Sequence, residues 1–593
     1  MNNMPEIQKP EGDQNVSGNM YSYREDNNYQ KETNAIRRSI GDANPNQDPK
    51  IRNSQVNYVP NYSYNPQNPT PVQIQQSELA YRSSLRTMTV PFLNSSLYWV
   101  YPLVLLLIEV VIITLFGCFY QLDNRNHTRD INNTEKENYF DQLANEEISL
   151  LYSTFLDVNI FIFAGIGILH NVLKKHSWAS IIINLICGVL SFQINLLFLL
   201  LWEVAFKEEP KKGIVNFESL TKSLYNSAPV LVSFGVVLGK LAFPQYIIMA
   251  GIESIACSLN YKLCDTKLGT IDSGGSLYIH LFGSIFGVAL SLVLFCSTKE
   301  KVKIRENDFM NKNGYFSNTI CFFGMLLLWC YFPSFNSSLI FNDVTRYRAI
   351  VNTYLALLGS TMGTTMMSPL LNRGQFVFEE ILFGSYSGGV MISGCCGVCD
   401  YGWTACLIGY ISGIITTLSL SVFKPFLVES GLQDSSNIIH AHGIPGFLGG
   451  FITPIIIGNF EQRDGTWKNN NYNAYKSMFS THCEDRTASQ QSGYQVAAIF
   501  ITIGISFIGG IATGYLMKVA RSCGAASRYF HDSEFFDVID DNILDAPGNM
   551  YNTPVYPMQQ SYVIRNKMDM SGFDNQGIKT ADMRVGNQPS YNN

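Results

Sequence analysis

The distribution of apolar residues constrains the fold of this 593-residue chain more than any other feature. From about Leu97 to Met517, roughly twelve apolar segments approach the ~20 residues that span a bilayer. Most are joined by short polar connections. The pattern predicts an all-α polytopic membrane protein, with spans near 97–119, 156–173, 179–201, 222–241, 244–264, 274–296, 315–334, 346–368, 376–394, 402–424, 439–458 and 495–518.

The two ends of the chain are hydrophilic. Residues 1–90 are rich in Asn, Gln, Pro, Ser and Tyr and contain too few aliphatic residues to bury a core, so we expect a disordered cytoplasmic tail. Residues 91–521 form the predicted transmembrane domain, and 522–593 a second cytoplasmic tail. No cleavable signal is expected, and the first span inserts as an internal anchor. The tails act as spacers or bind partner proteins.

Charged connections predict the orientation. Lys174-Lys175 and the segment from Lys299 to Arg305 lie in loops that the positive-inside rule places in the cytosol. With an even number of spans, both termini are then cytoplasmic. The opposite loop carries glycosylation sequons at Asn126 and Asn132. The plasma membrane and a vacuolar membrane both remain open as locations.

Several function classes find no support in the sequence. A nucleic-acid partner is not expected, because there is no basic patch. The thirteen cysteines are scattered, and the Cys-x-x-Cys spacing from Cys396 to Cys399 lacks a second pair or a nearby histidine, which favours packing over metal binding. No nucleophile, metal cluster or phosphate loop is apparent, so we expect neither an enzyme nor a cofactor.

Two segments place a histidine where an uncompensated polar group is expensive. Asp272 precedes His280 by eight residues, and Asp434 precedes His442 by the same interval. Each histidine opens an apolar, glycine-containing span. Polar groups at such depth call for a functional explanation.

The spacing also predicts internal symmetry. With the first span set aside as an extra helix, spans 2–6 and 7–11 form two inverted five-helix repeats, followed by a final helix. Each histidine then lies on the fifth helix of its repeat. Gly283 and Gly446 would let these two helices cross closely and bring the imidazoles together.

Paired imidazoles suit the passage of a weak base. A neutral imidazole accepts a hydrogen bond at one nitrogen and donates at the other, and a deprotonated base is far cheaper to desolvate than its cation. Asp272 either stabilises nearby positive charge or caps the helix start. His440 is two residues from His442 and faces elsewhere on a helix, so we assign it to the helix start or to packing.

At this point the chain resembles the Rhesus glycoprotein branch of the ammonium transporter superfamily, in order through about residues 97–520. The extra first span and the Pro-Ser-Phe-Asn-Ser form favour that branch over the microbial and plant transporters. The motifs that carry the resemblance are Ser233-Phe-Gly-Val-Val-Leu-Gly-Lys240, Asp272-x7-His280-x2-Gly283, Trp329-Cys-Tyr-Phe-Pro-Ser-Phe-Asn-Ser337, Arg348-Ala-Ile-Val-Asn-Thr-Tyr354 and His442-Gly-Ile-Pro-Gly446.

The resemblance implies a homotrimer in the lipid bilayer with a hydrophobic pore through each subunit. The pore would conduct ammonia derived from ammonium, with carbon dioxide as a further candidate gas. His280 and His442 match the twin pore histidines, and Phe335 matches one ring of the external gate. Asp272 matches the family's buried aspartate, and Asp434 is its counterpart in the second repeat.

Three positions depart from the family pattern. The other gate phenylalanine falls on Tyr225, whose hydroxyl would favour cation recruitment or slow admission at the mouth. Tyr261 stands where relatives often carry an acidic residue, which puts recruitment by negative charge in doubt. His440 replaces the asparagine of the family's Asn-Leu-His-Gly motif.

Three acidic residues lie near or within the spans. Glu253 lies deep in span 5, where a hydrogen-bonded structural role is favoured. Glu379 and Glu380 open span 9, and their interpretation as solvated charges at a helix end is favoured over a vestibule role.

Three functions are compatible with these observations. The first is a facilitator that deprotonates ammonium at the mouth and conducts ammonia. The second is an electrogenic ammonium transporter in which the histidines relay the released proton. The third is an ammonium sensor or scaffold that acts through its tails.

Overall fold

The computed structural model describes residues 100–122, 150–173, 176–207, 212–295, 314–459 and 486–519, together with Asp532 and Phe536. The chain divides into residues 1–89 and 90–593, and every described residue lies in the second unit. The basic connections and most of both tails therefore lie outside the described residues. The domain bounds drawn from the sequence stay predictions.

The first half of the bundle follows the apolar runs, because a helix satisfies its own backbone polar groups in lipid. The label η denotes a π-helical segment. The elements are α3 (Val100–Phe119), the helix Leu150–Leu169 with η2 (Ile160–Ile166) and α5 (Gly167–Leu169), η3 (Ala179–Ile183) with α6 (Asn184–Lys207), α7 (Phe217–Val237), α8 (Phe243–Lys262) with η4 (Leu263–Leu268), and η5 (Ser276–Leu281) with α9 (Phe282–Phe295).

The second half repeats this pattern and ends in a long helix. Its elements are α11 (Tyr315–Ser337), α12 (Asp343–Leu371), α13 (Phe378–Ile392), α14 (Gly402–Leu418) with η7 (Ser419–Phe423) and α15 (Lys424–Ser430), η8 (Ile439–Gly443) with α16 (Ile444–Gly458), and α19 (Ala488–Val519).

The all-α polytopic fold is confirmed. Within the described ranges, nine helices are long and apolar enough to cross a membrane, and α7, α12 and α13 run among them with more polar and small residues. The number of twelve spans stays a prediction. Some helices begin earlier than expected because polar residues extend them. Asn216 caps α7 by accepting the Ser219 backbone N–H at 2.9 Å.

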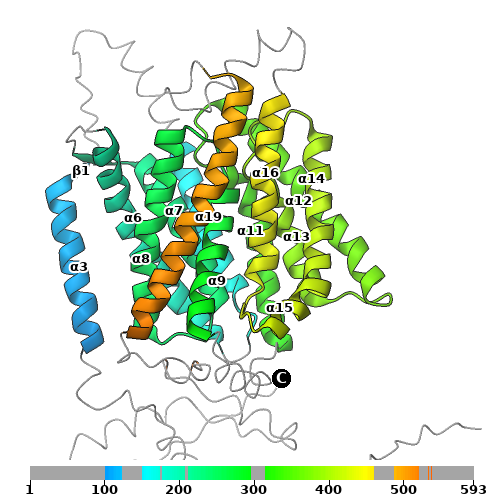
Figure 1. Cartoon of the computed structure of the whole chain (residues 1–593), viewed down its shortest axis with the longest axis horizontal. Helices are drawn as coiled ribbons and strands as arrows, with labels where there is room; N and C mark the ends of the chain where they lie inside the picture. The colour runs from blue at the N-terminus through cyan, green and yellow to red at the C-terminus, as the bar shows by residue number, and fades with distance from the viewer. Residues whose placement is uncertain are drawn as a thin grey trace, which may run out of the picture. The chain divides into compact units, whose positions relative to one another are not determined.

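Helix α3 lies at the edge of the bundle beside α6 (Figure 1). Most of its side chains are exposed, as expected of a helix that faces lipid. Beyond α3, β1 (Tyr120–Leu122) pairs in parallel with β2 (Gly213–Val215), a contact that the sequence did not indicate. We call the side of the bundle with β1 and β2 the loop face. The side where α19 ends is the tail face.

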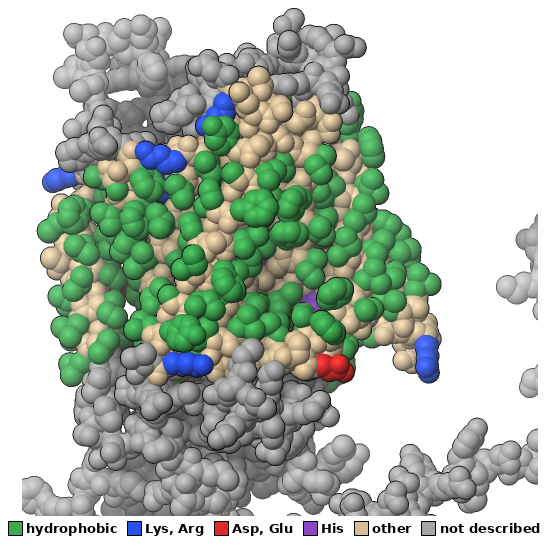
Figure 2. Space-filling view, in the orientation of Figure 1, with side chains coloured by type: hydrophobic (Ala, Val, Ile, Leu, Met, Phe, Trp, Pro, Cys, Tyr) green, Lys and Arg blue, Asp and Glu red, His purple; other side chains and the backbone are tan. Residues whose placement is uncertain are grey.

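Apolar side chains cover the broad surface in Figure 2, and lysines and arginines lie near its upper and lower edges. This is the pattern of a surface embedded in lipid. Small residues bring α12 close to α14. A Cβ on Gly409 would lie 1.9 Å from the Ala356 carbonyl oxygen, so only glycine allows that contact.

The two halves hold each other through reciprocal backbone bonds. The segment before η5 donates from Gly274 N to the carbonyl of Ser393, directly after α13, at 2.9 Å. The segment before η8 donates from Ser435 N to Val236 O, near the end of α7, at 3.1 Å. Each π-helical segment is thus anchored on the third helix of the other repeat, as inverted repeats would arrange.

Candidate functional site

Both histidines lie on π-helical segments that follow an aspartate cap. The Asp272 carboxylate accepts the backbone N–H groups of Leu277 and Tyr278 at 2.8 and 2.7 Å. The Asp434 carboxylate accepts that of Ile439 at 2.8 Å. The capping role considered for Asp272 is therefore present. In each carboxylate the second oxygen, Oδ1, is buried and forms no hydrogen bond within the described structure.

The imidazoles of His280 and His442 meet in the interior. Their Nδ1 atoms are 3.0 Å apart, and the ring centroids are separated by 5.0 Å. One nitrogen must donate and the other accept, so at least one ring is neutral. The close crossing depends on Gly446, where a Cβ would lie 3.2 Å from the Cβ of His280.

The expectation for Gly283 is wrong. A Cβ on Gly283 would meet the Pro229 carbonyl oxygen at 2.5 Å, so this glycine brings α9 against α7 and not against the other histidine helix. The second close contact between the two histidine helices is made by Gly443. A Cβ there would lie 2.4 Å from the Ser284 hydroxyl oxygen.

Tyr386 on α13 extends the histidine pair. Its hydroxyl lies 3.1 Å from His442 Nε2, and its ring is fully buried. At the other end of this series of contacts, His280 Nε2 is buried and forms no hydrogen bond within the described structure. The sequence interpretation missed Tyr386. Its position between Gly384 and Gly388, in a stretch of small residues, is the signal that marks a close helix approach.

A stack of aromatic rings lies on the loop-face side of the histidines. Phe335 stacks on Tyr225 with centroids 5.7 Å apart and on Phe161 with centroids 4.2 Å apart. Phe332 contacts Phe335 edge-on and lies 6.1 Å from the His280 ring. The sequence interpretation had named Phe335 and Tyr225 but neither Phe161 nor Phe332.

The Tyr225 hydroxyl is already engaged. It donates to the backbone carbonyl of Asp272 at 2.6 Å, so the ring is tied to the cap of the His280 segment. Tyr261, the second departure from the family pattern, contacts Tyr225 and Tyr278 edge-on. The loop-face end of the site is therefore lined by aromatic rings.

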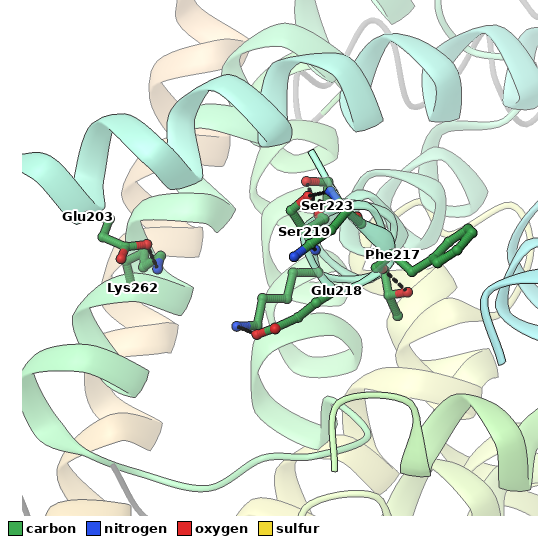
Figure 3. A network of polar contacts seen from close by, with 9 residues as sticks. Glu203, Phe217, Glu218, Ser219, Ser223 and Lys262 are labelled. Atoms are coloured by element: carbon green, nitrogen blue, oxygen red, sulfur yellow. Dashed lines mark hydrogen bonds and ion pairs between the residues drawn. The ribbon is translucent and has the colours of Figure 1, made fainter. Parts of the chain in front are cut away.

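Two ion pairs lie beside this end of the site. Lys262 binds Glu203 at 3.0 Å, as Figure 3 shows, and Lys222 binds Glu218 at 2.6 Å. They line a hollow of about 330 Å³ between α6, α7 and α8. Both signs of charge alternate there, so this surface carries no block of negative charge.

Three polar residues named from the sequence pack on the tail-face side. His440 Nδ1 lies 2.6 Å from the Ser419 hydroxyl and makes no part of the histidine pair. The solvated interpretation of Glu380 is wrong, because this carboxylate is 3% exposed and accepts both a Ser421 hydroxyl and the Asn372 amide. Glu379 forms an ion pair with Lys424.

One residue beyond the last helix docks on the tail face. Asp532 accepts the backbone N–H groups of Trp178 and Ala179 at 2.7 and 2.9 Å. Burial raises the pKa of Asp532 to about 6, and the two amide bonds oppose that rise. The docked carboxyl thus holds a proton more tightly than a free one, whose pKa is about 4. Docking weakens as the pH rises from about 4 to about 6 and is constant above.

The remaining expectations from the sequence concern the glycosylation sequons and the cysteines. The sequons at Asn126 and Asn132 lie outside the described residues. Cys395, Cys396 and Cys399 are buried and free, in agreement with packing. Across the described part of the chain, no cluster of His, Cys, Asp or Glu has the arrangement of a metal site.

Comparison with known proteins assigns the chain to a family. The profile of the Ammonium Transporter Family matches residues 142–523, more than half of the sequence. The chain belongs to the ammonium transporter family. The matched part begins after α3, in keeping with an additional first helix. This membership indicates a multi-pass membrane transporter.

Individual relatives agree with the Rhesus resemblance. An ammonium transporter Rh type B of Xenopus tropicalis is 30% identical over 451 residues, which cover 74% of this chain and 93% of that protein. An ammonium transporter Rh type C of Xenopus laevis is 29% identical over 430 residues, covering 72% and 88%. The resemblance to the Rhesus branch is confirmed.

Solved structures share the fold at lower identity. The Rh50 protein of Nitrosomonas europaea aligns with a TM-score of 0.54 at 22% identity, over 72% of this chain and 100% of that one. Mep2 of Candida albicans aligns with a TM-score of 0.50 at 16% identity, over 65% and 86%. The transporter therefore has the architecture of these membrane proteins.

Proposed function

We propose that this transporter is a facilitator that deprotonates ammonium at its loop-face mouth and conducts ammonia past Phe335, His280 and His442. The 3.0 Å contact between the two buried imidazoles carries the proposal. His280 Nε2 is left to hydrogen-bond a passing molecule, because no described group occupies it. Neutral imidazoles serve ammonia as donor or acceptor, whereas the ammonium cation pays a large desolvation cost at this depth.

The aromatic stack forms the outer gate in this proposal. The proton of the Tyr225 hydroxyl is committed to the Asp272 carbonyl, so the phenolic oxygen offers only lone pairs to an arriving ion. Ammonium has four N–H donors and is also attracted to ring faces. Two roles were considered for this hydroxyl, recruitment of a cation and slower admission at the mouth. Both would follow from this one hydrogen bond.

The two aspartates combine both roles considered from the sequence. One oxygen of Asp272 holds the start of η5, and its Oδ1 has no hydrogen-bonding partner among the described residues. That oxygen lowers the energy of positive charge that forms while ammonium loses its proton. In Asp434, too, one carboxylate oxygen caps a helix start and Oδ1 has no hydrogen-bonding partner among the described residues. It would act at the tail-face end of the pore.

The assembly and the membrane setting are also part of the proposal, supported by the Rhesus resemblance, the basic connections and the sequons. We propose a homotrimer in a plasma or vacuolar membrane, with one pore in each subunit, both termini in the cytosol and glycans on Asn126 or Asn132. Cross-linking of the purified protein tests the trimer. Glycosidase treatment tests the glycans.

Single substitutions of the histidines test the proposal. His280→Ala and His442→Ala should each reduce the ammonia-dependent pH change of proteoliposomes at least about tenfold, since each leaves its partner ring unpaired. His440→Ala is the matched control, because it also removes a buried imidazole but one that bonds Ser419. Unaltered flux in both pore variants would remove the twin-histidine assignment.

A second candidate is supported by the chain that links His280, His442 and Tyr386. Because each contact joins a nitrogen to a nitrogen or oxygen, the three groups can pass a proton along. An electrogenic transporter would use this path, and an ammonium-driven current would identify it. A sensor that acts through the tails predicts an inert pore, which methylammonium uptake into vesicles would reveal.

A further inference from the structure

A third acidic residue lies inside the bundle, away from the histidine pair. Glu253 on α8 is 0% exposed. Its Oε1 contacts the hydroxyl of Ser233 on α7, and its Oε2 is buried without a hydrogen-bonding partner among the described residues. None of the ion pairs within the described part of the chain includes Glu253.

Counting protons around Ser233 fixes the state of this carboxyl. The Ser233 oxygen lies within bonding distance of Glu253 and, at 2.7 Å, of the Gly283 carbonyl oxygen on α9. A hydroxyl has one proton, and a carbonyl oxygen has none to give. Each contact is a full, unshared hydrogen bond only when Glu253 itself carries a proton. Glu253 then donates to Ser233, and Ser233 donates to Gly283.

Burial leads to the same conclusion independently. An ionised carboxylate without solvent or a cation would be uncompensated, and its desolvation cost greatly exceeds that of a neutral acid. An anion would also draw the only Ser233 proton toward itself. The Gly283 carbonyl would then lose its side-chain partner.

This chain of bonds joins three helices next to the histidine pair. Gly283 is three residues after His280, where η5 passes into α9. The same glycine touches α7 so closely that a Cβ would lie 2.5 Å from the Pro229 carbonyl oxygen. The two hydrogen bonds from Glu253 on α8 through Ser233 to Gly283 therefore hold the start of α9, three residues after His280. They fix the position of the His280 ring.

We propose that Glu253 is held as a neutral carboxylic acid and is a positioning residue for His280. The link to flux rests on the proposed pore, whereas the protonation state does not. Infrared spectroscopy reads that state directly at neutral pH. The difference between the wild type and Glu253→Gln should contain a carboxylic-acid carbonyl band that shifts on labelling glutamate with ¹³C.

Transport separates positioning from charge. Glu253→Gln keeps a neutral donor of the same shape and should retain flux within about twofold of the wild type. Glu253→Leu and Ser233→Ala remove the chain and should lower flux about tenfold, the effect of one lost buried hydrogen bond. Ser227→Ala is the control, because Ser227 is buried on the same helix as Ser233 and its hydroxyl donates to the Leu224 carbonyl within that helix.

Each outcome decides one question. A difference spectrum with only carboxylate bands would overturn the proposal, whatever the transport result. Flux lost equally in Glu253→Gln and Glu253→Leu would overturn the positioning role and indicate a need for charge. If His280→Ala and His442→Ala both leave flux unchanged while the carboxylic-acid band is present, the proposed pore fails and the neutral state of Glu253 stands.

Discussion

In the proposed pore, the hydroxyl of Tyr225 would hold the loop-face gate closed, and one substitution removes this hydroxyl. It donates to the Asp272 carbonyl at 2.6 Å while its ring stacks on Phe335. Tyr225→Phe keeps the ring and leaves that carbonyl unpaired in the closed gate. A buried hydrogen bond of this kind contributes ~1–1.4 kcal/mol. Since opening the stack must break it, we expect ammonia flux to rise about five- to tenfold.

Stopped-flow fluorescence of a pH dye inside proteoliposomes measures this change. The control is Tyr246→Phe, which removes another buried hydroxyl, away from the ring stack. The Tyr246 hydroxyl donates to the Val237 carbonyl at 3.1 Å. We expect no increase in the control. Equal or reduced flux in a correctly assembled Tyr225→Phe protein would refute this role of the Tyr225 hydroxyl.

Three further predictions concern other contacts. Tyr386→Phe leaves His442 Nε2 unpaired, so it should lower flux about three- to tenfold and shift the ¹⁵N resonances of His442. An unchanged ¹⁵N spectrum would contradict the hydrogen bond. Asp272→Ala should lower the free energy of unfolding by about 1–2 kcal/mol, measured by thermal unfolding, whereas Asp272→Asn keeps the cap and should lose flux only. An equal loss of stability in the two variants argues against capping. Hydrogen exchange of the Trp178 amide, corrected for intrinsic rates, should slow as pH falls from 6 to 4, and Asp532→Asn should abolish that dependence.

The sequence was sufficient to predict the meeting of the histidines, because Asp272 to His280 and Asp434 to His442 repeat one spacing. It misjudged one glycine. Gly446 is four residues after its histidine and Gly283 is three after its own, and these offsets lie on opposite sides of the histidine's face of a helix. Gly446 therefore meets the helix that carries His280, whereas Gly283 meets α7.

Contacts between distant helices were beyond the sequence. Tyr386 reaches His442 across 56 positions, and Phe161 meets Phe335 from the helix Leu150–Leu169. The glycines beside Tyr386 indicate a close helix approach, but no local pattern identifies the partner in either contact. The π-helical turns that carry both histidines rotate the following side chains, and apolar periodicity does not reveal them. Glu380 was misread because its partners, Asn372 and Ser421, come from other segments.

The central claim is that ammonia, and not ammonium, passes His280 and His442. Simultaneous recording of internal pH and membrane current under an ammonium gradient, in membranes containing the purified protein, tests it most directly. We predict a rapid internal alkalinisation without a current that follows the ammonium gradient. A current that reverses at the ammonium equilibrium potential would contradict neutral conduction and favour a proton relay through His442 and Tyr386.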